Sequence, residues 1–92
     1  MPAYMIVGFN PIDKEKLQQY GAEVLHTLKK FSGEYVAKGP SEAIYGAYPF
    51  QMQVILAFPS KDEALSWYQS EDYQAIIPLR DAAMDSQFQL IG

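Results

Sequence analysis

The sequence predicts an α+β protein with the ferredoxin-like order βαββαβ, in which a four-stranded antiparallel sheet carries its helices on one face. Two observations support this prediction. Segments with strand patterns stand at residues 3–9, 34–39, 51–58 and 87–91, and helical periodicity occupies the two long segments that separate them. With right-handed crossovers, elements in this order form a single sheet.

Length and composition indicate one small domain, residues 1–92. About half of the residues (49%) are hydrophobic, which is enough for one core and no second domain. The chain has no cysteine, so disulfides, thiol nucleophiles and cysteine-containing zinc sites are excluded. No apolar run reaches the roughly 18 residues that a membrane span needs, and the first ten residues lack the features of a secretory signal. We therefore expect a cytoplasmic protein without a membrane partner.

The net charge of −4 arises entirely in the second half of the chain. Lysines and acids balance in residues 1–50, whereas residues 51–92 have only two basic residues against six acids. The one basic cluster, Lys29-Lys30, stands at the predicted end of a helix, where it interacts favourably with the helix dipole. Because nucleic-acid binding needs clustered positive charge, we expect no nucleic-acid partner.

The first strand, residues 3–9, is a continuous apolar run, which is typical of a strand covered on both faces. Asn10 or Asp13 can cap the helix that follows. Ser32-Gly33 ends this helix, with Gly33 suited to the left-handed position. The predicted inward stripe of the helix consists of Leu17, Tyr20, Gly21, Val24, Leu25, Leu28 and Phe31.

The second strand covers residues 34–39 and alternates between its two faces. Tyr35 and Ala37 are predicted on one face, and Val36 and Lys38 on the other.

A hairpin is predicted after the turn signal Gly39-Pro40-Ser41. Residues 42–50 are interpreted as its return arm, bent near Gly46. Residues 51–58 form the clearest strand, because one face carries only apolar residues, namely Met52, Val54, Leu56 and Phe58.

The second helical segment begins at Ser60, where Ser60-Lys61-Asp62-Glu63 forms a capping box. Ser70 is a second N-cap, so we expect the helix to be split near Ser70. Pro78 lies too far inside the following piece for a first turn and is predicted to kink or split it. One side of that piece carries Tyr73, Ile76, Ile77, Arg80, Ala83 and Met84.

The first and third strands have apolar residues on both faces, although the helices cover only one. The two faces of the first strand are formed by Tyr4, Ile6 and Gly8 and by Met5, Val7 and Phe9. A solvated face would alternate with polar residues. The simplest cover is the same face of a second copy, so we predict a homodimer closed through the sheet face.

The stretch FPSKDEALSWYQSEDYQAIIPLR, residues 58–80, resembles the signature of the bacterial domain-of-unknown-function family 1330. The resemblance implies the dimeric α+β barrel fold but no established reaction, because the family is named for lacking one. Related barrels include cofactor-free quinol oxygenases, heme-degrading oxygenases, lactone isomerases and proteins with no known chemistry, which is an analogy at the level of the fold. Many members have arginine where this chain has Lys38, which lacks bidentate geometry, and Glu34 replaces a second glycine. The matching positions are Ala3-Tyr4, Gly33, Tyr35, Phe58-Pro59-Ser60, Ala64, Trp67-Tyr68, Ser70, Tyr73, Arg80 and Gly92.

Arg80 is the only arginine and lies within an apolar stripe, where an unpaired guanidinium is costly to bury. Three interpretations remain open. Arg80 can form an internal ion pair with Glu34, Glu63 or Glu71 or bind carbonyl groups. It can bind a ligand carboxylate or another anion, or Pro78 can rotate it into solvent.

Several aromatic residues suit either a core or a pocket. Trp67, Tyr68 and Tyr73 flank the break at Ser70, and they can pack in the core or form the wall of a pocket for a flat ligand. Tyr20 can direct its hydroxyl into the same space. The aromatic residues of the hairpin arm, which we favour as dimer or packing contacts over a lid, are Tyr45, Tyr48 and Phe50.

Most catalytic and metal-binding patterns are missing. His26, the only histidine, lies opposite Leu17 on the helical wheel, so we expect it in solvent and not as a general base. The pairs Asp62-Glu63 and Glu71-Asp72 fall in first turns of helices, which accounts for them without a metal. No nucleophile elbow or glycine-rich phosphate loop is present. We therefore predict neither a metal nor another cofactor.

Two function classes remain. The first is a binding module for a small organic or aromatic acid. The alternative is a cofactor-independent oxygenase or isomerase, with Arg80 holding an anion and tyrosines donating protons. The lack of an evident base favours the binding module, and the question of catalysis stays open. The candidate ligand-binding residues are Arg80, Tyr73, Tyr68, Trp67, Tyr20 and Lys38.

Overall fold

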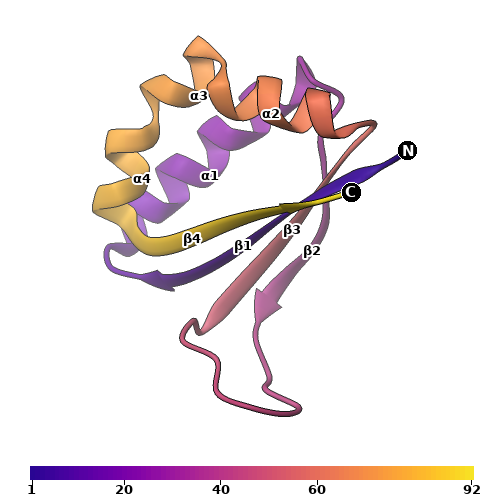
Figure 1. The fold of residues 1–92 in the computed structure, drawn as a ribbon. Helices are drawn as coiled ribbons and strands as arrows, with labels where there is room; N and C mark the ends of the chain where they lie inside the picture. The colour runs from indigo at the N-terminus through magenta and orange to yellow at the C-terminus, as the bar shows by residue number, and fades with distance from the viewer.

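The structure, a computed structural model, describes residues 1–92 and has the predicted ferredoxin-like fold (Figure 1). The four strands form one antiparallel sheet in the order β2-β3-β1-β4, and the helices cover one of its faces. The elements in chain order are β1 (Ala3–Pro11), α1 (Lys14–Lys29), β2 (Glu34–Pro40), β3 (Met52–Phe58), α2 (Lys61–Gln69), α3 (Glu71–Ala75), α4 (Ile77–Ala83) and β4 (Met84–Ile91).

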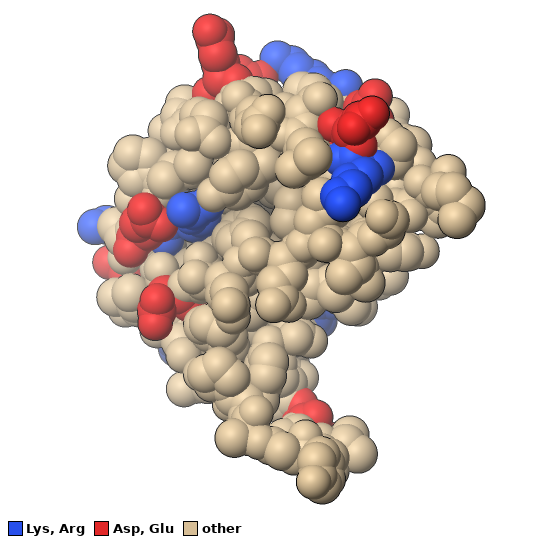
Figure 2. Space-filling view, in the orientation of Figure 1, with Lys and Arg blue, Asp and Glu red and all other residues tan.

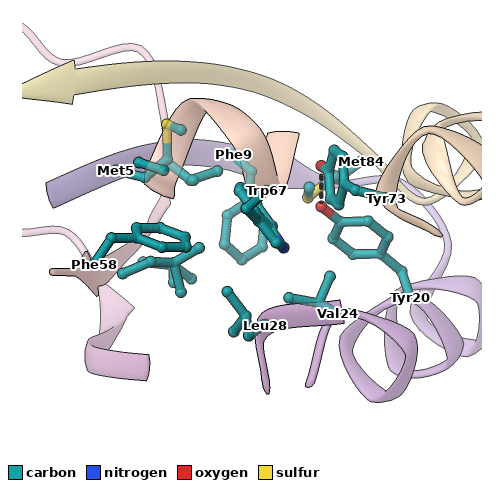
Figure 3. Close-up of a cluster of buried hydrophobic side chains, with 13 residues drawn as sticks. Met5, Phe9, Tyr20, Val24, Leu28, Phe58, Trp67, Tyr73 and Met84 are labelled. Carbon is teal, nitrogen blue, oxygen red and sulfur yellow. Dashed lines mark hydrogen bonds between the residues drawn. The ribbon is translucent and has the colours of Figure 1, made fainter. Parts of the chain in front are cut away.

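The core lies between the helices and the inner face of the sheet. β1 pairs with β3 from Ala3 opposite Phe58 to Phe9 opposite Met52, which brings the apolar positions of both strands onto the inner face. Figure 3 shows the resulting cluster, in which the rings of Phe58 and Trp67 lie 5.4 Å apart. The inward residues predicted for β3 are buried, apart from Met52 at its start, which is partly buried.

Asp13 is the N-cap of helix α1, and its side chain accepts a hydrogen bond from the Lys16 backbone N–H at 3.1 Å. Asn10, the other candidate cap, contacts a different part of the chain. The prediction that Leu25 lies on the inward stripe was wrong, because half of its surface is exposed. The face that packs on the core is narrower than the predicted stripe. Its buried residues are Tyr20, Val24, Thr27 and Leu28, and Leu17 and Phe31 of the stripe pack against the core while partly buried.

The residue in the left-handed region after α1 is Ser32, with φ +56°, and not Gly33 as predicted. Gly33 is required for a different reason. A Cβ there would lie 2.7 Å from both Leu28 Cδ2 and Phe58 Cε1, so the position has no room for a side chain. The chain therefore has its smallest residue where the side chains of Leu28 on α1 and Phe58 on β3 lie against the backbone.

Strand β2 has a bulge that the alternation of its residues did not reveal. Tyr35 lies opposite Leu56 and Ala37 lies opposite Ile55, with Val36 as the extra residue. The prediction that Tyr35 and Ala37 share a face was therefore wrong, because an inserted residue reverses the alternation after it. Lys38, opposite Val54, now shares the inner face with Tyr35.

Residues 41–51 form an irregular arm, and the segment 42–50, interpreted as the return arm of the hairpin, pairs with no strand. The side chain of Asn10 holds the end of the arm by two hydrogen bonds. It accepts from the Gln51 backbone N–H at 2.7 Å and donates to the Pro49 carbonyl at 3.1 Å. Gly46 has φ +81° at the predicted bend. Pro49 has no N–H to pair with a neighbouring strand, which disfavours a strand here.

The second helical segment consists of three short helices. Ser60 and Ser70 cap α2 and α3 as predicted, by accepting bonds from the backbone N–H groups of Glu63 and Tyr73. Pro78 does split the segment, but it lies in the first turn of α4, where its missing N–H has no consequence. β4 begins at Met84, three residues before the prediction. No helix of this fold has the length and apolar character needed to cross a membrane.

Candidate functional site

A hydrogen-bonded chain of three side chains runs through the helix layer. Arg80 Nη1 donates to the Tyr73 hydroxyl at 3.3 Å, and the Tyr73 and Tyr20 hydroxyls lie 2.6 Å apart (Figure 3). Tyr73 is fully buried and Tyr20 nearly so. Because Tyr20, Tyr73 and Arg80 come from α1, α3 and α4 respectively, the chain exists only when these helices pack together.

Arg80 has mainly aromatic surroundings. Its Nη1 also donates to the Tyr68 hydroxyl at 2.9 Å, and its guanidinium lies 5.1 Å from the centre of the Phe88 ring. Its one carboxylate partner is Asp81, which accepts from Nε at 3.1 Å and is largely exposed. The side chain of Arg80 itself is only 13% exposed. Its hydrogen bonds to the protein use Nε and Nη1, so Nη2 has no protein acceptor.

The internal ion pair suggested for Arg80 exists with a different partner. The carboxylates that we considered in the sequence were Glu34, Glu63 and Glu71, whereas the structure pairs Arg80 with its neighbour Asp81. The three short helices direct the guanidinium toward Tyr68 and Phe88. The sequence predicts breaks at Ser70 and Pro78 but not the angles between the pieces, which decide where Arg80 points. Arg80 is also not rotated into solvent.

The buried hydroxyls keep their protons. Burial is the largest cause of the raised pKa of Tyr20, and the contact with Tyr73 raises it further. Burial also raises the pKa of Tyr73, although its hydrogen bonds to Tyr20 and Arg80 oppose the shift. Burial alone would lower the pKa of Arg80, but the bonds that it donates to Tyr68 and Tyr73 outweigh this effect and raise it. The cluster therefore consists of neutral phenols around one cation.

An inner cavity of about 40 Å³ lies between α1 and the sheet. It opens between Leu17, Gly21, Tyr35 and Lys38 into a groove of about 620 Å³ that runs along α1 and β2. Tyr20 lines the inner cavity, which connects the hydrogen-bonded chain to this opening. The wall of the inner cavity is otherwise mainly apolar, formed by Val7, Phe9, Leu17, Val24, Val54, Leu56, Trp67, Met84 and Phe88.

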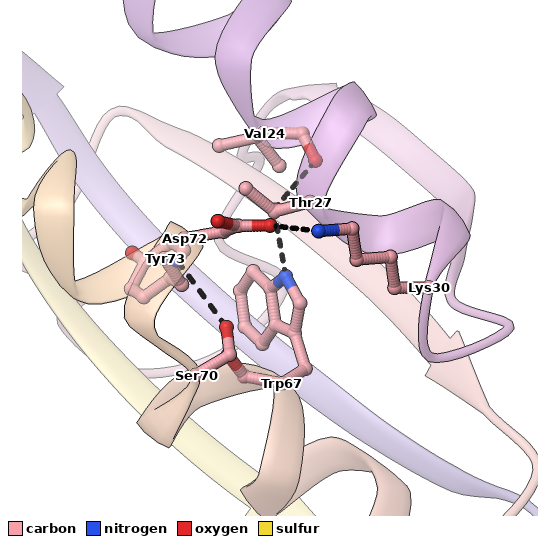
Figure 4. A network of polar contacts seen from close by, with 7 residues as sticks. All are labelled: Val24, Thr27, Lys30, Trp67, Ser70, Asp72 and Tyr73. Carbon is pink, nitrogen blue, oxygen red and sulfur yellow. Dashed lines mark hydrogen bonds and ion pairs between the residues drawn. The ribbon is translucent and has the colours of Figure 1, made fainter.

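Trp67 lines the inner cavity and is also hydrogen-bonded to helix α1. Its indole Nε1–H donates to the Thr27 hydroxyl at 2.9 Å, and this hydroxyl donates to the Val24 carbonyl at 2.8 Å (Figure 4). Beside this contact, Lys30 and Asp72 form an exposed ion pair between the end of α1 and α3. The buried indole is thus fully bonded to α1, which fixes its orientation.

The structure gathers the six candidate residues into two connected groups. Arg80 and Tyr68 face a hollow on the surface of α4 and β4, whereas Tyr20, Trp67 and Lys38 line the inner cavity. Tyr73 is buried between the groups and bonded to both Arg80 and Tyr20. His26 is exposed on α1, as predicted.

Two residues of the site were missed in the sequence. Phe88 lies beneath the Arg80 guanidinium and lines both the hollow and the inner cavity. Its alternation with Leu90 in β4 was a usable signal, because both residues point to the helix-covered face. Thr27 gave no signal, since a threonine next to apolar positions in a helix is common on half-buried faces.

Comparisons with known proteins agree with this fold. The profile of the family described as "Domain of unknown function (DUF1330)" matches residues 2–92. No match was found among curated proteins.

Solved structures of other proteins have similar folds. A protein of unknown function from Rhodopseudomonas palustris has a TM-score of 0.80 at 17% identity, over 98% of this chain and 80% of that one. A dimeric ferredoxin-like protein of unknown function from Jannaschia sp. has a TM-score of 0.77 at 12% identity, over 100% and 99%.

One similar structure is that of an enzyme. SnoaB, a cofactor-independent oxygenase from Streptomyces nogalater, has a TM-score of 0.70 at 10% identity, over 99% of this chain and 91% of that one. Identities this low establish the shared fold alone. The family match, by contrast, extends over nearly the whole sequence. The chain therefore belongs to the DUF1330 family, which is defined by a domain of unknown function.

Proposed function

We propose that this chain is a cytoplasmic homodimeric binding module for a small organic acid, preferably an aromatic one, and that the acid binds in the inner cavity. The observation that carries the proposal is the hydrogen-bonded chain from Arg80 through Tyr73 to Tyr20, a residue that lines the cavity. A cation linked in this way to an apolar cavity favours a ligand that bears a negative oxygen.

The chemistry of the groups fixes the direction of one of the two hydrogen bonds. A guanidinium only donates, so the Tyr73 oxygen accepts from Arg80. In the bond between Tyr73 and Tyr20, 2.6 Å long, either hydroxyl can donate, and we propose that a ligand acceptor in the cavity selects the order in which Tyr73 donates to Tyr20. This order leaves the Tyr20 proton for an acceptor in the cavity. Because each bond polarises the next, the positive charge of Arg80 strengthens Tyr20 as a donor.

The walls and the opening suit a flat acid. Trp67, Phe9 and Phe88 offer ring surfaces, and Lys38 stands at the opening as a second cation. Small-molecule sites usually measure about 300–1,000 Å³, so the inner cavity must enlarge to admit a ring. Its opening lies at Tyr35 and Lys38, two exposed side chains of β2, an edge strand of the sheet, whose movement would join the cavity to the groove.

The dimer that we propose closes through the outer face of the sheet. This face presents Ile6, Ile55 and Ala57 at its centre, and all three are only partly buried in the single chain. Dimeric ferredoxin-like proteins are among the similar structures, including one from Bacteroides fragilis with a TM-score of 0.65. An apolar outer face that meets its own copy is the simplest way to remove this surface from water.

The alternative is a cofactor-independent oxygenase or isomerase, favoured by the fold shared with SnoaB. Such chemistry needs a group that removes a proton from the substrate. The raised pKa values of Tyr20 and Tyr73 make these phenols donors and poor bases at neutral pH. His26 is exposed on α1 and does not line the inner cavity. These observations favour binding without turnover.

The test uses benzoate, salicylate and the neutral analogue benzyl alcohol as probes. Trp67 is the only tryptophan and lines the cavity, so its fluorescence reports occupancy directly. We expect saturable binding of the two acids, at least tenfold weaker binding of benzyl alcohol, and at least tenfold weaker binding of the acids to Tyr20→Phe. Lys30→Met, which removes an exposed cation outside the cavity, serves as the matched control and should bind normally.

Two results would contradict the binding proposal. One is equal affinity of Tyr20→Phe and the unchanged chain for benzoate and salicylate. The other is the absence of saturable binding for either acid. Oxygen consumption with a hydroquinone, if it disappears in Tyr20→Phe, would instead support the oxygenase alternative.

A further inference from the structure

The tip of the arm, residues 41–51, presents two exposed hydrophobic side chains. Ile44 is 89% exposed and Tyr45 is 99% exposed. Figure 1 shows the arm extending past the end of the sheet, away from the helices, and Figure 2 shows it as a separate lobe with little charge. Two large apolar residues on a protruding lobe have no partner within their own chain. Such exposed apolar groups indicate an interaction surface.

The base of the arm, in contrast, is firmly attached. Asn10 bonds both Pro49 and Gln51, and the Tyr48 hydroxyl accepts from Gln53 Nε2 at 2.5 Å. Gly8 leaves room for this attachment. A Cβ at Gly8 would lie 2.7 Å from a ring carbon of Phe50 and from the Tyr48 hydroxyl oxygen. The sequence thus holds the base of the arm against the outer face while leaving its tip free.

The arm and the outer face together form a cup of about 530 Å³. Its walls include Ala37 and Ile55 of the sheet and Tyr45 and Tyr48 of the arm. Ile55 also belongs to the outer face that the proposed dimer covers. The cup is therefore continuous with that face, and a copy docked on the face would lie against the arm.

The arm adds to the area that a dimer through the sheet face can bury. Four strands about 4.8 Å apart and at least seven residues long, at about 3.3 Å a residue, cover at least about 440 Å² in plan. A stable interface buries about 800 Å² of accessible surface on each partner. The arm is the adjoining apolar surface that brings the contact closer to this size.

Charge also favours a second copy as the occupant. Across the centre of the outer face, the facing pairs are Tyr4–Ala57, Ile6–Ile55 and Gly8–Gln53, none of which is charged. The charges on this face, Glu34 opposite Ala57 and Asp85 opposite Asn10, lie on the edge strands β2 and β4. An uncharged centre can meet an identical centre without repulsion, which a centre with charge of one sign cannot do.

We propose that the arm grips a second copy of this chain, with Ile44 and Tyr45 packing on the partner copy. The inference rests on the sheet-to-sheet dimer proposed above and assigns the arm as the part that makes this dimer stable. Each copy gives its arm to the other, because a two-fold axis makes the contacts reciprocal.

The test measures the dimer dissociation constant by sedimentation velocity for the full chain. We expect Ile44→Ser/Tyr45→Ser to raise this constant at least tenfold, because each substitution removes a large apolar group from the contact. The double variant should remain folded, since both side chains are exposed in the single chain. The control is Ile12→Ser/Leu65→Ser, which removes two exposed apolar residues outside the outer face and the arm and should leave the constant unchanged.

A third variant separates the two proposals. Ile6→Lys places a charge at the centre of the outer face and should dissociate the dimer. If Ile6→Lys dissociates it while the arm variant and the control have equal constants, the arm inference is overturned and the sheet dimer stands. If the unchanged chain remains monomeric at millimolar concentration, both proposals are wrong.

Discussion

The Tyr20 hydroxyl on α1 lies 2.6 Å from the Tyr73 hydroxyl on α3, and their rings meet edge to face. The contact joins segments 53 residues apart in the chain. It also satisfies two phenols that the core would otherwise leave without partners, since buried polar groups are unfavourable unless they are hydrogen-bonded. In the binding that we propose, the same contact links Arg80 to the inner cavity, so one contact would serve both packing and ligand binding.

The Tyr20–Tyr73 contact predicts strong coupling between the two residues. Each single variant, Tyr20→Phe or Tyr73→Phe, leaves the other hydroxyl buried with fewer partners and should lower the free energy of unfolding by about 1–3 kcal/mol. The double variant should lose less than the sum of the two, because no phenol of the pair then remains unsatisfied. Urea denaturation of the four proteins measures the coupling. Simple additivity of the two losses would contradict a direct bond.

Stability should fall in alkaline solution because of these two phenols. The pKa values of Tyr20 and Tyr73 are raised in the folded state, whereas tyrosines of the unfolded chain lose their protons near pH 10. Above that pH the folded state holds more protons than the unfolded state, so the free energy of unfolding decreases as pH rises. Below about pH 9 both states are protonated, and the two groups cause no change.

The expected slope above pH 10 is up to about 1.4 kcal/mol per pH unit for each of the two phenols. Urea denaturation at steps between about pH 8 and pH 11.5 measures it. Tyr20→Phe/Tyr73→Phe should show a shallower decline across the same range. Equal slopes for the double variant and the unchanged chain would show that other groups cause the decline.

Replacing Arg80 by methionine should have only a modest effect on stability. The ion pair of Arg80 is with an exposed carboxylate, and such pairs contribute about 0–1 kcal/mol. The Tyr73 hydroxyl loses the bond from Arg80 but keeps its bond to Tyr20, and a methionine can pack its sulfur on the ring of Phe88. We therefore expect Arg80→Met to lower the free energy of unfolding by about 2 kcal/mol or less, while binding of benzoate is weakened. A loss of about 3–5 kcal/mol, as when a buried ion pair is broken, would assign Arg80 a structural role instead.

The Thr27 hydroxyl should contribute to the stability of the fold, because it is the acceptor for the buried Trp67 indole N–H. Thr27→Val keeps the shape but leaves the Trp67 indole N–H without its acceptor, which should lower the free energy of unfolding by about 1–3 kcal/mol. Thr27→Ser keeps the acceptor and serves as the control, with the loss of one methyl group. Thermal unfolding followed by circular dichroism compares the two variants. A valine variant as stable as the serine variant would mean that the indole has another partner.

Much of the fold could be predicted because its signals are local. The alternation in β3 and the serine caps at Ser60 and Ser70 depend on residues close in sequence. The bulge at Val36 was missed because it depends on how β2 aligns with β3, a partner about 20 residues away in the chain. Local pattern describes an element, whereas its register is decided by pairing.

The sequence predicted which residues belong to the candidate site but not the cavity and the ion pair that they form. Arg80, Tyr73 and Tyr68 do come together, and Tyr20 joins them as expected. The inner cavity and its opening could not be predicted, because they depend on the spacing between α1 and the sheet. Neither could the choice of Asp81 as the ion-pair partner, since three short helices orient the guanidinium differently from one continuous helix.

The turn after α1 gives a last prediction that separates backbone conformation from space. Ser32 has φ +56°, a conformation that glycine adopts without strain, so Ser32→Gly should raise the free energy of unfolding by about 1 kcal/mol. Gly33→Ala should lower it by about 1–3 kcal/mol, because the new methyl group overlaps Leu28 and Phe58. Gly21→Ala is the control, since a Cβ there has no neighbour within 4 Å and alanine favours the helix. If Gly33 were instead required for a left-handed backbone, Gly33→Ala would be harmful but Ser32→Gly would bring no gain. Equal stability of all three variants would contradict the close packing of Leu28 and Phe58 against Gly33.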